Sequence, residues 1–529
     1  MRYHRTLLFL ILILLSSCAK KHFYQSTALV NPAQQAHLQQ DSVLAVAGKH
    51  YDKSKLHELL FGKHYRDIWA TPIQVKVFNA DTAFGGLRVT EKGGGMQTKS
   101  IKFKDQEGRE YALRSIDKDP AKPLPAFWQK TFIATLLRDQ TSAANPYGAF
   151  VLEPMAQAAG IFYTHPRLVY LKKEDPDVGE FAQEYGGQLM LLEERNEEKE
   201  AIIPEIHGEN ADDMMDTEDV LRKRFNSNEH QFDQVFFARN RLFDMLIGDW
   251  DRHEGQWQWI EYEKGKEHIY RPIPKDRDQA FNQFRDGIIP WLASRFFPGR
   301  KFTSFHYKID DVEALLYNAS FIDARALNEV TREQWIKLGQ ELKQSITDSI
   351  IEASIKQWPQ PVYDQIGLET IAKLKSRRDQ LPQVAEQVYE ELAKDVMVIG
   401  SDEEEIFRIL RKNDSETVVE MWRPENGKKP EKLLYSRTFY ENETDEITIY
   451  GLGEDDKFEV SGKVKKGIKI TLVGGLGEDE FTDESNVKGL CKHTIIKDTH
   501  RGTEIEKSKE TKDRRRRNIK VNLFDREGY

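Results

Sequence analysis

The sequence predicts an α+β protein in two parts, a large mixed domain at about 60–395 and a smaller all-β domain at about 400–490. Three observations lead to this prediction. Strand-like alternation fills much of 73–116, apolar residues recur at helical spacing over 219–247 and 331–395, and short strands with glycine turns follow Ser401. A chain of 529 residues, 39% of them hydrophobic, is long enough to bury a substantial core in each part.

The large domain begins with an antiparallel β unit and continues as mostly helical sequence. Alternation at 73–77, 100–103 and 110–116, with a turn at 107–108, predicts the β unit. Apolar spacing predicts helices at 127–137 and 147–159, an apolar run predicts a buried strand at 187–194, and 219–247 predicts one long amphipathic helix. The all-β domain is expected to be a solenoid or a sandwich, with 491–529 as a charged tail or as its last strands.

The amino terminus has the pattern of a lipoprotein signal. Arg2 and Arg5 supply positive charge, residues 7–15 are an unbroken apolar run, and Cys18 follows in a lipobox-like context. The apolar run is too short to span a bilayer. We therefore expect removal of 1–17, a lipid on Cys18 and a polar tether over 18–60. Because no acidic residue follows Cys18 until Asp41, we expect an outer-membrane lipoprotein that faces the periplasm, with the membrane as its partner.

Composition gives no indication of nucleic-acid binding. The formal net charge is −9, and the one basic run, 514–517, lies in a segment of mixed charge that is typical of a solvated surface. We therefore expect no nucleic-acid partner.

A cluster of oxygen-bearing side chains is predicted after the long helix. Residues 248–253, Gly-Asp-Trp-Asp-Arg-His, follow it where a loop can display polar groups at a pocket floor. A β-hairpin turning at 263–266 then returns the chain to its start, where 276–278 reads Asp-Arg-Asp. The hairpin brings together four potential ligands of Mg²⁺ or Mn²⁺, which are Asp251, Gln256, Asp276 and Asp278.

This order of helix, Asp-x-His, a polar residue five positions after the Asp, hairpin and Asp-x-Asp resembles the catalytic segment of atypical kinase-like folds, notably HipA-type, CotH-type and secretory-pathway kinases. The resemblance implies that Asp251 orients or deprotonates an acceptor hydroxyl and that Asp276, with Asp278 as a second candidate, holds the metal. Gln256 stands where these families have Asn or Glu, and its longer side chain changes its reach toward a metal. His253 completes the catalytic-loop motif, and we expect it to orient the loop rather than to bind metal.

The same resemblance implies a nucleotide site upstream. The glycines Gly93, Gly94 and Gly95 lie between two predicted strands, where their backbone N–H groups can cover phosphates. Arg114 stands where kinases place a phosphate-binding lysine, and Lys118 is a nearby alternative. Glu193 lies in a segment that looks like the hinge strand, whose backbone would meet a base.

A second resemblance concerns the whole chain. Residues 85–87, 93–98, 113–118 and 248–253 resemble motifs of a Bacteroidetes-type family of envelope proteins of largely unknown activity. The likeness covers most of 60–490. It implies an envelope lipoprotein with a kinase-like central domain.

The all-β domain carries a repeated motif. Gly451-Leu-Gly-Glu-Asp455 recurs twenty-four residues later as Gly475-Leu-Gly-Glu-Asp479, and the second copy resembles the repeat of Ca²⁺-binding β-rolls. One interpretation is a Ca²⁺ site at Asp455 and Asp479. The other is a pair of strand turns without a metal, because two copies at this spacing are far from a tandem array.

These observations predict a lipoprotein whose kinase-like domain transfers phosphate from a nucleotide to a hydroxyl with the help of Mg²⁺ or Mn²⁺. Three alternatives remain at this point. First, residues 248–253 could be a structural loop in which Arg252 pairs with a carboxylate. Second, the protein could be a non-catalytic assembly or scaffold lipoprotein with an envelope protein as partner. Third, it could be a metal-dependent hydrolase, although no two-histidine metal motif supports this.

Overall fold

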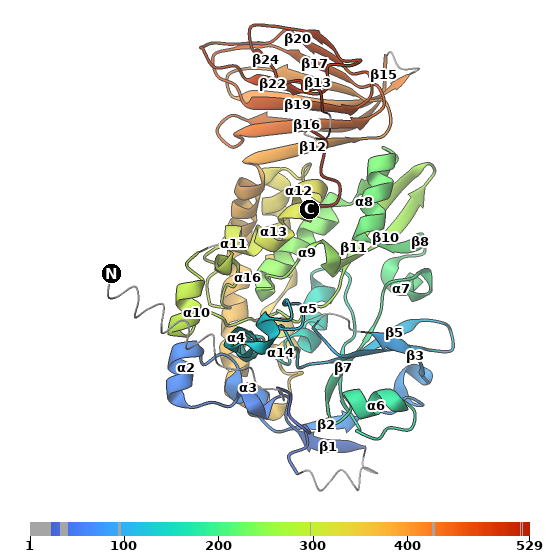
Figure 1. Cartoon of the computed structure of the whole chain (residues 1–529), viewed down its shortest axis with the longest axis vertical. Coiled ribbons are helices and arrows are strands. Elements are labelled where there is room, and N and C mark those ends of the chain that lie inside the picture. Colours follow the sequence, from blue (N-terminus) through green and yellow to red (C-terminus); the bar gives the residue numbers. More distant parts are fainter. Residues whose placement is uncertain are drawn as a thin grey trace.

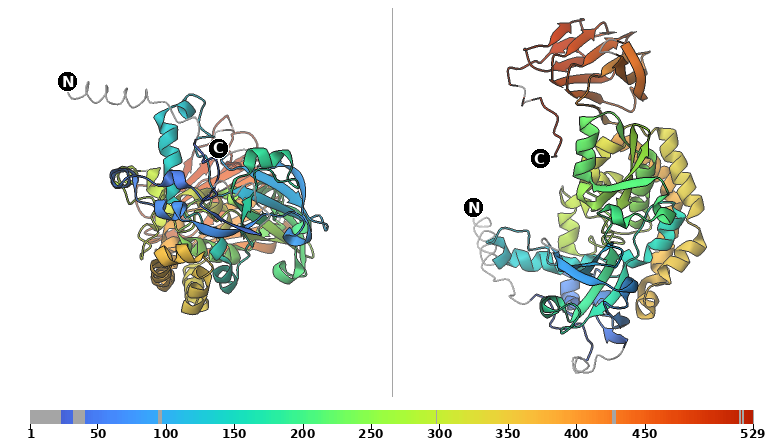
Figure 2. Two further views of the ribbon diagram at one scale, coloured as in Figure 1. Left: turned by 90° about the horizontal axis from the view of Figure 1, so that it is seen from below. Right: turned by 90° about the vertical axis from the view of Figure 1, so that its right-hand side faces the viewer.

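The computed structural model describes residues 23–31, 41–93, 97–296, 298–425, 429–518, 520 and 522–528. Cys18, Gly94 and Gly95 lie outside these residues. The chain is elongated: a β-rich lobe lies at one end, a helical lobe in the middle and an all-β domain at the other end (Figures 1 and 2). Among the helices of the described residues, none combines the length and apolar character needed to cross a bilayer.

The N-terminal lobe is built on a seven-stranded sheet in the order β1-β2-β6-β7-β5-β4-β3. Neighbours from β3 to β6 in this order are antiparallel, as the alternating sequence predicts, whereas β2 and β6 are parallel. The elements of the lobe are β1 (Ser42–Ala45), α2 (Lys55–Phe61), α3 (Arg66–Ala70), β2 (Ile73–Val77), β3 (Arg88–Gly93), β4 (Ser100–Lys104), β5 (Glu110–Ser115), α4 (Phe132–Gln140), α5 (Glu153–Ala158), β6 (Arg167–Leu171), α6 (Glu180–Tyr185) and β7 (Gln188–Glu194).

The expected tether over 18–60 is wrong for the described part of that range. Val43 and Ala45 of β1 are buried, and so are Leu29 and Tyr51 on either side of the strand. β1 pairs antiparallel with β2, so this segment closes one edge of the sheet. The small and polar residues of this segment gave no clear sign of a strand, because only alternate side chains of a short edge strand need to be apolar.

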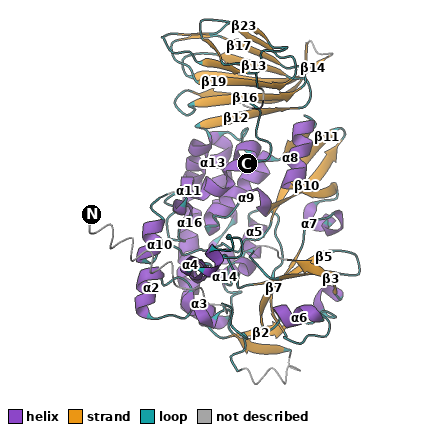
Figure 3. Cartoon of the chain, in the orientation of Figure 1, coloured by secondary structure: helices purple, strands orange, loops and turns teal. Residues whose placement is uncertain are grey.

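The helical lobe packs around α9, which is buried over most of its length and contacts α13 and α16 (Figure 3). A small sheet in the order β8-β10-β11-β9 lies beside these helices. The elements are α7 (Pro204–His207), β8 (Ala211–Asp216), α8 (Thr217–Asn226), β9 (His230–Phe232), α9 (Gln234–Ile247), β10 (Trp257–Lys264), β11 (Glu267–Pro274), α10 (Ile288–Ala293), α11 (Val312–Leu316), α12 (Ser320–Ala326), α13 (Arg332–Ser345), α14 (Asp348–Ile355), α15 (Gln360–Val362) and α16 (Leu368–Leu392).

The single long helix expected over 219–247 is also wrong, because α8, β9 and α9 occupy this stretch. Asp216 caps α8 by accepting a hydrogen bond from the backbone N–H of Asp219, and Asp233 caps α9 by accepting one from Phe236. The residues between the helices let β9 pair with β11. Both helices bury one face in the same domain, so their apolar periodicity continues across a break that only the caps reveal.

The C-terminal domain is a parallel β-solenoid. Its coils place parallel strands in two main sheets, β12-β16-β19-β22-β24 and β13-β17-β20-β23, and in a short third sheet, β18-β21, while the hairpin β14–β15 extends the second sheet. The strands are β12 (Asp395–Ser401), β13 (Ile406–Arg411), β14 (Glu416–Glu425), β15 (Lys429–Tyr440), β16 (Glu446–Gly453), β17 (Lys457–Ser461), β18 (Lys463–Val464), β19 (Lys469–Leu476), β20 (Glu480–Asp483), β21 (Asn486–Val487), β22 (Thr494–Lys497), β23 (Glu504–Glu506) and β24 (Thr511–Asp513). Residues 494–513 are therefore the last strands of the solenoid and not a charged tail.

Successive coils of the solenoid pair at a spacing of twenty-three residues, one residue less than the spacing between the two copies of the sequence motif. Phe458 pairs with Phe481, twenty-three residues later, and their rings stack at 4.6 Å. In this register the buried Asp456 lies above the buried Asp479, and the backbone N–H of Asp456 donates to Asp479 Oδ1 at 3.0 Å. Asp455 lies exposed in the turn. Asp455 and Asp479 thus do not occupy equivalent positions, contrary to the expected Ca²⁺ pair.

The α+β architecture predicted from the sequence is confirmed: a two-lobed mixed domain is followed by a small all-β domain. The two parts are joined by polar contacts. Arg224 of α8 donates to the carbonyl oxygens of Ile399 and Gly400, and Asn228 donates to Glu405 inside the first coil.

Candidate functional site

A cavity of about 460 Å³ between the two lobes is lined by most of the charged residues that the motifs predict. Arg114 and Lys118 come from the N-terminal lobe, and Asp251, Asp276 and Asp278 come from the loops at the ends of the β10–β11 hairpin. The rest of the lining is largely apolar and includes Trp69, Ile116, Leu136, Leu137, Phe150, Leu191, Trp250, Phe284, Ile289, Pro290, Ala293 and Phe302. Residues far apart in the sequence therefore meet in one cavity with a charged side and an apolar side.

The loop that carries Asp251 begins where α9 ends. Gly248 has φ 71°, a left-handed conformation that glycine adopts without strain, and its N–H donates to the carbonyl oxygen of Asp244. Oδ1 of Asp251 accepts a hydrogen bond from Asn318 at 2.8 Å, and Lys301 donates to the amide oxygen of Asn318 at 3.0 Å. A chain of polar contacts therefore fixes the carboxylate of Asp251 in the cavity wall.

Asp244, which is fully buried in α9, contacts arginines from both of the loops that carry the cavity carboxylates. Its carboxylate contacts Arg252 at 3.5 Å, Arg277 at 3.2 Å and Arg241 at 3.1 Å. Arg252 belongs to the Asp251 loop and also donates to the carbonyl oxygens of Lys275 and Gln256. Arg277 lies between Asp276 and Asp278. The two loops are thus positioned by one carboxylate that does not line the cavity itself.

Asp249 is a buried acid directly behind Asp251. Its Oδ1 accepts a hydrogen bond from the backbone N–H of Asp251 at 3.1 Å. Burial, reinforced by the nearby charge of Asp244, raises the pKa of Asp249 to about 7, although Arg252 acts in the opposite direction. The group therefore titrates near neutral pH next to the loop that carries Asp251.

Asp276 and Asp278 face cations from the N-terminal lobe. Asp276 adopts φ 50°, which is uncommon for a residue other than glycine, and its Oδ2 lies 3.6 Å from Arg114 Nη1. Burial raises the pKa of Asp276, but Lys118 and Arg114 lower it further, so the net pKa is below its usual value. Asp278 forms an ion pair with Lys118. Asp276 is therefore an anion at neutral pH, and the carboxylate of Asp278 is paired with a cation.

The remaining catalytic-loop residues do not line the cavity. His253 accepts a hydrogen bond from the backbone N–H of Gly255 at 3.1 Å, and its loop-orienting role stays a prediction. Gln256 ends the short turn η8 (Glu254–Gln256), where its carbonyl oxygen accepts from Arg252 and from the backbone of Lys275. Among the described residues, the carboxylates of the cavity that could hold a metal are those of Asp251, Asp276 and Asp278.

The structure brings some of the predicted nucleotide-binding residues to the cavity and leaves others outside it. Gly93 ends β3 opposite Ser100, and Gln97 and Thr98, which follow the glycine run, line the cavity. Glu193 lies in β7, and Leu191 of the same strand lines the cavity whereas Glu193 does not. Its backbone belongs to the ladder between β7 and β5, and its buried carboxylate accepts a hydrogen bond from Thr164. Burial raises the pKa of Glu193 and Arg114 opposes this shift.

Sequence reasoning missed the residues that position the site. Asp244 and Arg241 are charged residues on the buried stripe of a helix, which is rare unless the charges are paired, so this pattern could have indicated the network. Asn318 and Lys301 had no local signal, because sixty-seven residues separate Asn318 from Asp251.

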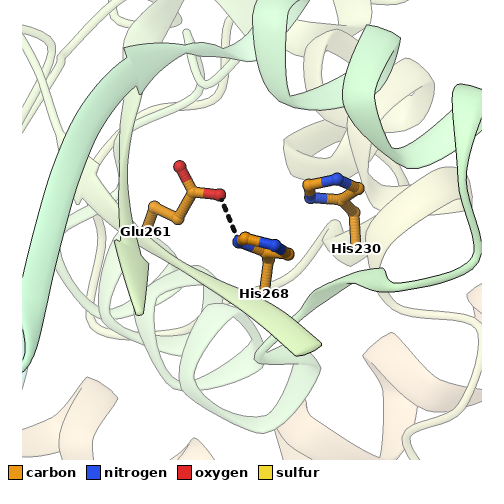
Figure 4. A group of neighbouring side chains, drawn as sticks. All are labelled: His230, Glu261 and His268. Atoms are coloured by element: carbon orange, nitrogen blue, oxygen red, sulfur yellow. Dashed lines mark ion pairs between the residues drawn. The ribbon is translucent and has the colours of Figure 1, made fainter. Parts of the chain in front are cut away.

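A second group of side chains lies on the small sheet, outside the cavity (Figure 4). His268 Nδ1 is 2.7 Å from Glu261 Oε1, and the ring of His268 stacks on that of His230 at 4.4 Å with an angle of 22°. Lone pairs of stacked rings lie in nearly parallel planes and do not converge on a metal, and Lys223 already pairs with Glu261 at 2.9 Å. We interpret this group as an ion-pair network of the sheet.

No protein-family model matches the chain, and no curated protein matches it. Solved structures give weak matches. A Helicobacter pylori proinflammatory kinase, CtkA, is 12% identical over 54% of this chain and 93% of its own, with a TM-score of 0.30. A Golgi casein kinase bound to Mn and ADP is 9% identical over 57% of this chain and 71% of its own, with a TM-score of 0.26. HipA of Shewanella oneidensis is 12% identical over 46% and 57%, with a TM-score of 0.22. Matches with such low TM-scores give no information on the roles of individual residues, so we infer these roles from the geometry of the cavity alone.

Proposed function

We propose that the protein is a membrane-anchored, atypical kinase-like phosphotransferase that uses a nucleotide and a divalent cation to phosphorylate a hydroxyl group. The observation that carries this proposal is the convergence of Asp251, Asp276, Asp278, Arg114 and Lys118 on one cavity. Phosphoryl transfer needs cations for the phosphate oxygens, carboxylates for a metal and a group that positions the acceptor, and these three types of group are together here.

Each residue has a role in this proposal. Asp276 and Asp278 supply the anionic oxygens that Mg²⁺ or Mn²⁺ prefers, and such an ion would neutralise phosphate charge. Arg114 and Lys118, which pair with these carboxylates in the structure, would bind phosphate oxygens. Asp251 would accept a hydrogen bond from the acceptor hydroxyl and orient it.

The membrane location is part of the proposal. The lipobox at Cys18 and the likeness to Bacteroidetes-type envelope proteins support a lipid anchor in the outer membrane, with the soluble domains in the periplasm.

A second candidate function is a non-catalytic envelope scaffold. The ion pairs Arg114–Asp276 and Lys118–Asp278 favour it, because they satisfy the cavity charges without a ligand. The solenoid adds parallel sheets that suit protein contacts. The two candidates predict different ligand effects on thermal unfolding.

Phosphotransfer by the purified mature chain tests the first candidate. We expect activity with nucleotide and Mg²⁺ or Mn²⁺ that falls steeply in Asp251→Ala and Asp276→Ala. The matched control is Asp379→Ala, since this carboxylate is exposed on α16. Undiminished activity in both cavity variants would exclude the assignment, whereas a melting temperature that responds to neither nucleotide nor metal would favour the scaffold.

A further inference from the structure

Helices α2 and α10 present a concentrated apolar surface to solvent. Ile288, Ile289, Trp291, Leu292 and Phe296 lie within nine residues of one another and are all exposed, and Trp291 remains 48% exposed and Phe296 70%. Contiguous exposed apolar surface of this kind indicates a binding surface rather than a random distribution. We name the surface formed by Leu56, Leu59, Ile288, Trp291, Leu292 and Phe296 the α2–α10 face.

The two helices of this face are held together by direct backbone contact. A Cβ atom on Gly287, just before α10, would lie 2.2 Å from the backbone nitrogen of Gly62, just after α2. The backbone N–H of His64 donates to Asp286 at 2.6 Å. The helices lie side by side in Figure 1. The two helices that carry the exposed apolar residues are therefore fixed beside each other.

The described part of the chain begins close to α2. Phe23, the first described residue, packs against the rings of His50 and Tyr51, and α2 begins four residues after Tyr51. Five residues connect Phe23 to Cys18 and span at most about 17 Å when extended. A lipid on Cys18 would therefore hold the bilayer near the α2–α10 face.

Basic side chains flank the face. Arg295 is exposed and lies over the ring of Trp291 at 4.5 Å, and Lys55 and Lys63 flank α2 with highly exposed side chains that form ion pairs with Glu58 and Asp67. Tryptophan beside basic residues is typical of the membrane interface, where apolar rings enter the acyl boundary and cations remain among the headgroups.

We infer that the α2–α10 face docks on the bilayer and that the acceptor is a membrane-held amphiphile with a hydroxyl in its headgroup. The second inference, on the acceptor, rests on the proposed phosphotransfer. Helix α10 forms the wall between this face and the cavity: Ile289, Pro290 and Ala293 line the cavity, while Trp291 and Leu292 do not. Docking therefore places the cavity wall at headgroup level.

The cavity itself suits such an acceptor. Its lining includes Asp251 and also Ile289, Phe284 and Phe302, and the rings of the two phenylalanines pack at 4.9 Å. An amphiphile could place its hydroxyl at Asp251 and its apolar part along these side chains.

Partitioning into vesicles tests the docking without the lipid. The mature chain with Cys18→Ser is mixed with vesicles of phosphatidylethanolamine and phosphatidylglycerol, and bound protein is measured by sedimentation. We expect binding that falls about tenfold or more in the double variant Trp291→Ser/Leu292→Ser, because two apolar side chains no longer leave water. The double variant Leu56→Ser/Leu59→Ser should show the same loss from the other helix.

The matched control is Leu433→Ser/Leu476→Ser, which removes two exposed leucines from the solenoid and should leave vesicle binding unchanged. No vesicle binding, or equal binding by both face variants and the control, would overturn the docking.

For the acceptor, phosphate transfer to a hydroxyl amphiphile in vesicles should fall in the face variants, while transfer to a water-soluble hydroxyl acceptor should not. Equal transfer to the vesicle amphiphile would overturn the acceptor class. A chain that binds vesicles but transfers no phosphate to any acceptor would refute the phosphotransferase proposal and leave the docking intact.

Discussion

Replacing Asp244 with asparagine tests whether this buried carboxylate holds the cavity loops. Asp244→Asn keeps the size of the side chain and removes its charge. In the folded protein the carboxylate contacts three arginines, Arg241, Arg252 and Arg277, at 3.1–3.5 Å. The asparagine amide can accept from one of them, but its NH₂ group must face another donor.

The expected loss of stability follows from these contacts. Removing one partner of a buried ion pair costs about 3–5 kcal/mol, since the remaining charge stays buried. Part of this loss should be recovered. Burial raises the pKa of Asp249 to about 7 and that of Asp323 to about 6, and the charge of Asp244 raises both. Without Asp244 both acids ionise more readily beside the arginines, so we expect a loss of about 3 kcal/mol, at the lower end of that range.

Urea unfolding followed by tryptophan fluorescence measures this loss, because every tryptophan except Trp422 precedes the solenoid. The control variant is Asp379→Asn on α16, whose carboxylate is about half exposed and should contribute less than about 1 kcal/mol. If Asp244→Asn lowered the free energy of unfolding no more than Asp379→Asn does, Asp244 would not organise the two loops.

Four further predictions concern other parts of the chain. Asp251→Asn should lower phosphotransfer by about 10²–10⁴-fold without lowering the urea midpoint, and a lower midpoint would indicate a structural role instead. Burial raises the pKa of Asp479 to about 7, whereas an unfolded aspartate titrates near about 4. The folded solenoid therefore binds more protons between these values, so its thermal stability should fall as pH rises from about 4 to about 7 and Asp479→Asn should flatten this profile; an unchanged slope in the variant would contradict the assignment. Gly451→Ala should destabilise the solenoid by about 1–3 kcal/mol in thermal unfolding, because the added Cβ would lie 2.0 Å from a buried carboxylate oxygen, and a wild-type midpoint would show that the coil can relax. Cys18→Ser, combined with Trp291→Ser/Leu292→Ser so that the α2–α10 face no longer docks, should move the protein from the membrane to the soluble fraction of cells, and unchanged membrane retention of a Cys18→Ser chain with this disabled face would disprove the lipid anchor.

The sequence predicted well those elements whose pattern is local. The alternation at 73–77, 100–103 and 110–116 corresponds to β2, β4 and β5, and the hairpin at 257–274 lies where its turn residues place it. The failures depend on information that periodicity does not contain. Asp216 and Asp233 divide one apolar pattern into two helices by capping each of them. The repeat around Asp455 suggested a spacing of twenty-four residues, but coils stack by strand pairing, and the pairing of Phe458 with Phe481 sets the spacing at twenty-three.

The candidate site was predictable where the chain returns to itself. The hairpin β10–β11 brings Asp251 and Asp276 to the same end, so their convergence follows from local sequence. The surroundings of Glu193 depend on long-range pairing, because the order β6-β7-β5 places its strand inside the sheet. Asn318, which holds Asp251, comes from a distant helix turn and could not be predicted from spacing.

The position of α10 connects the two halves of the proposed function. A lipid anchor alone would leave the cavity free to point in any direction, since a tether restrains distance and not orientation. A rigid apolar surface beside the anchor restrains orientation as well, because only one way of lying on the bilayer buries Trp291 and Leu292. The same helix contributes Ile289 and Pro290 to the cavity that Asp251 also lines, so the proposed orientation, which would bury the outer residues of α10, would bring this cavity to the membrane surface. An acceptor held in that surface would then reach the cavity without leaving the bilayer, which is the advantage that anchoring gives such an enzyme.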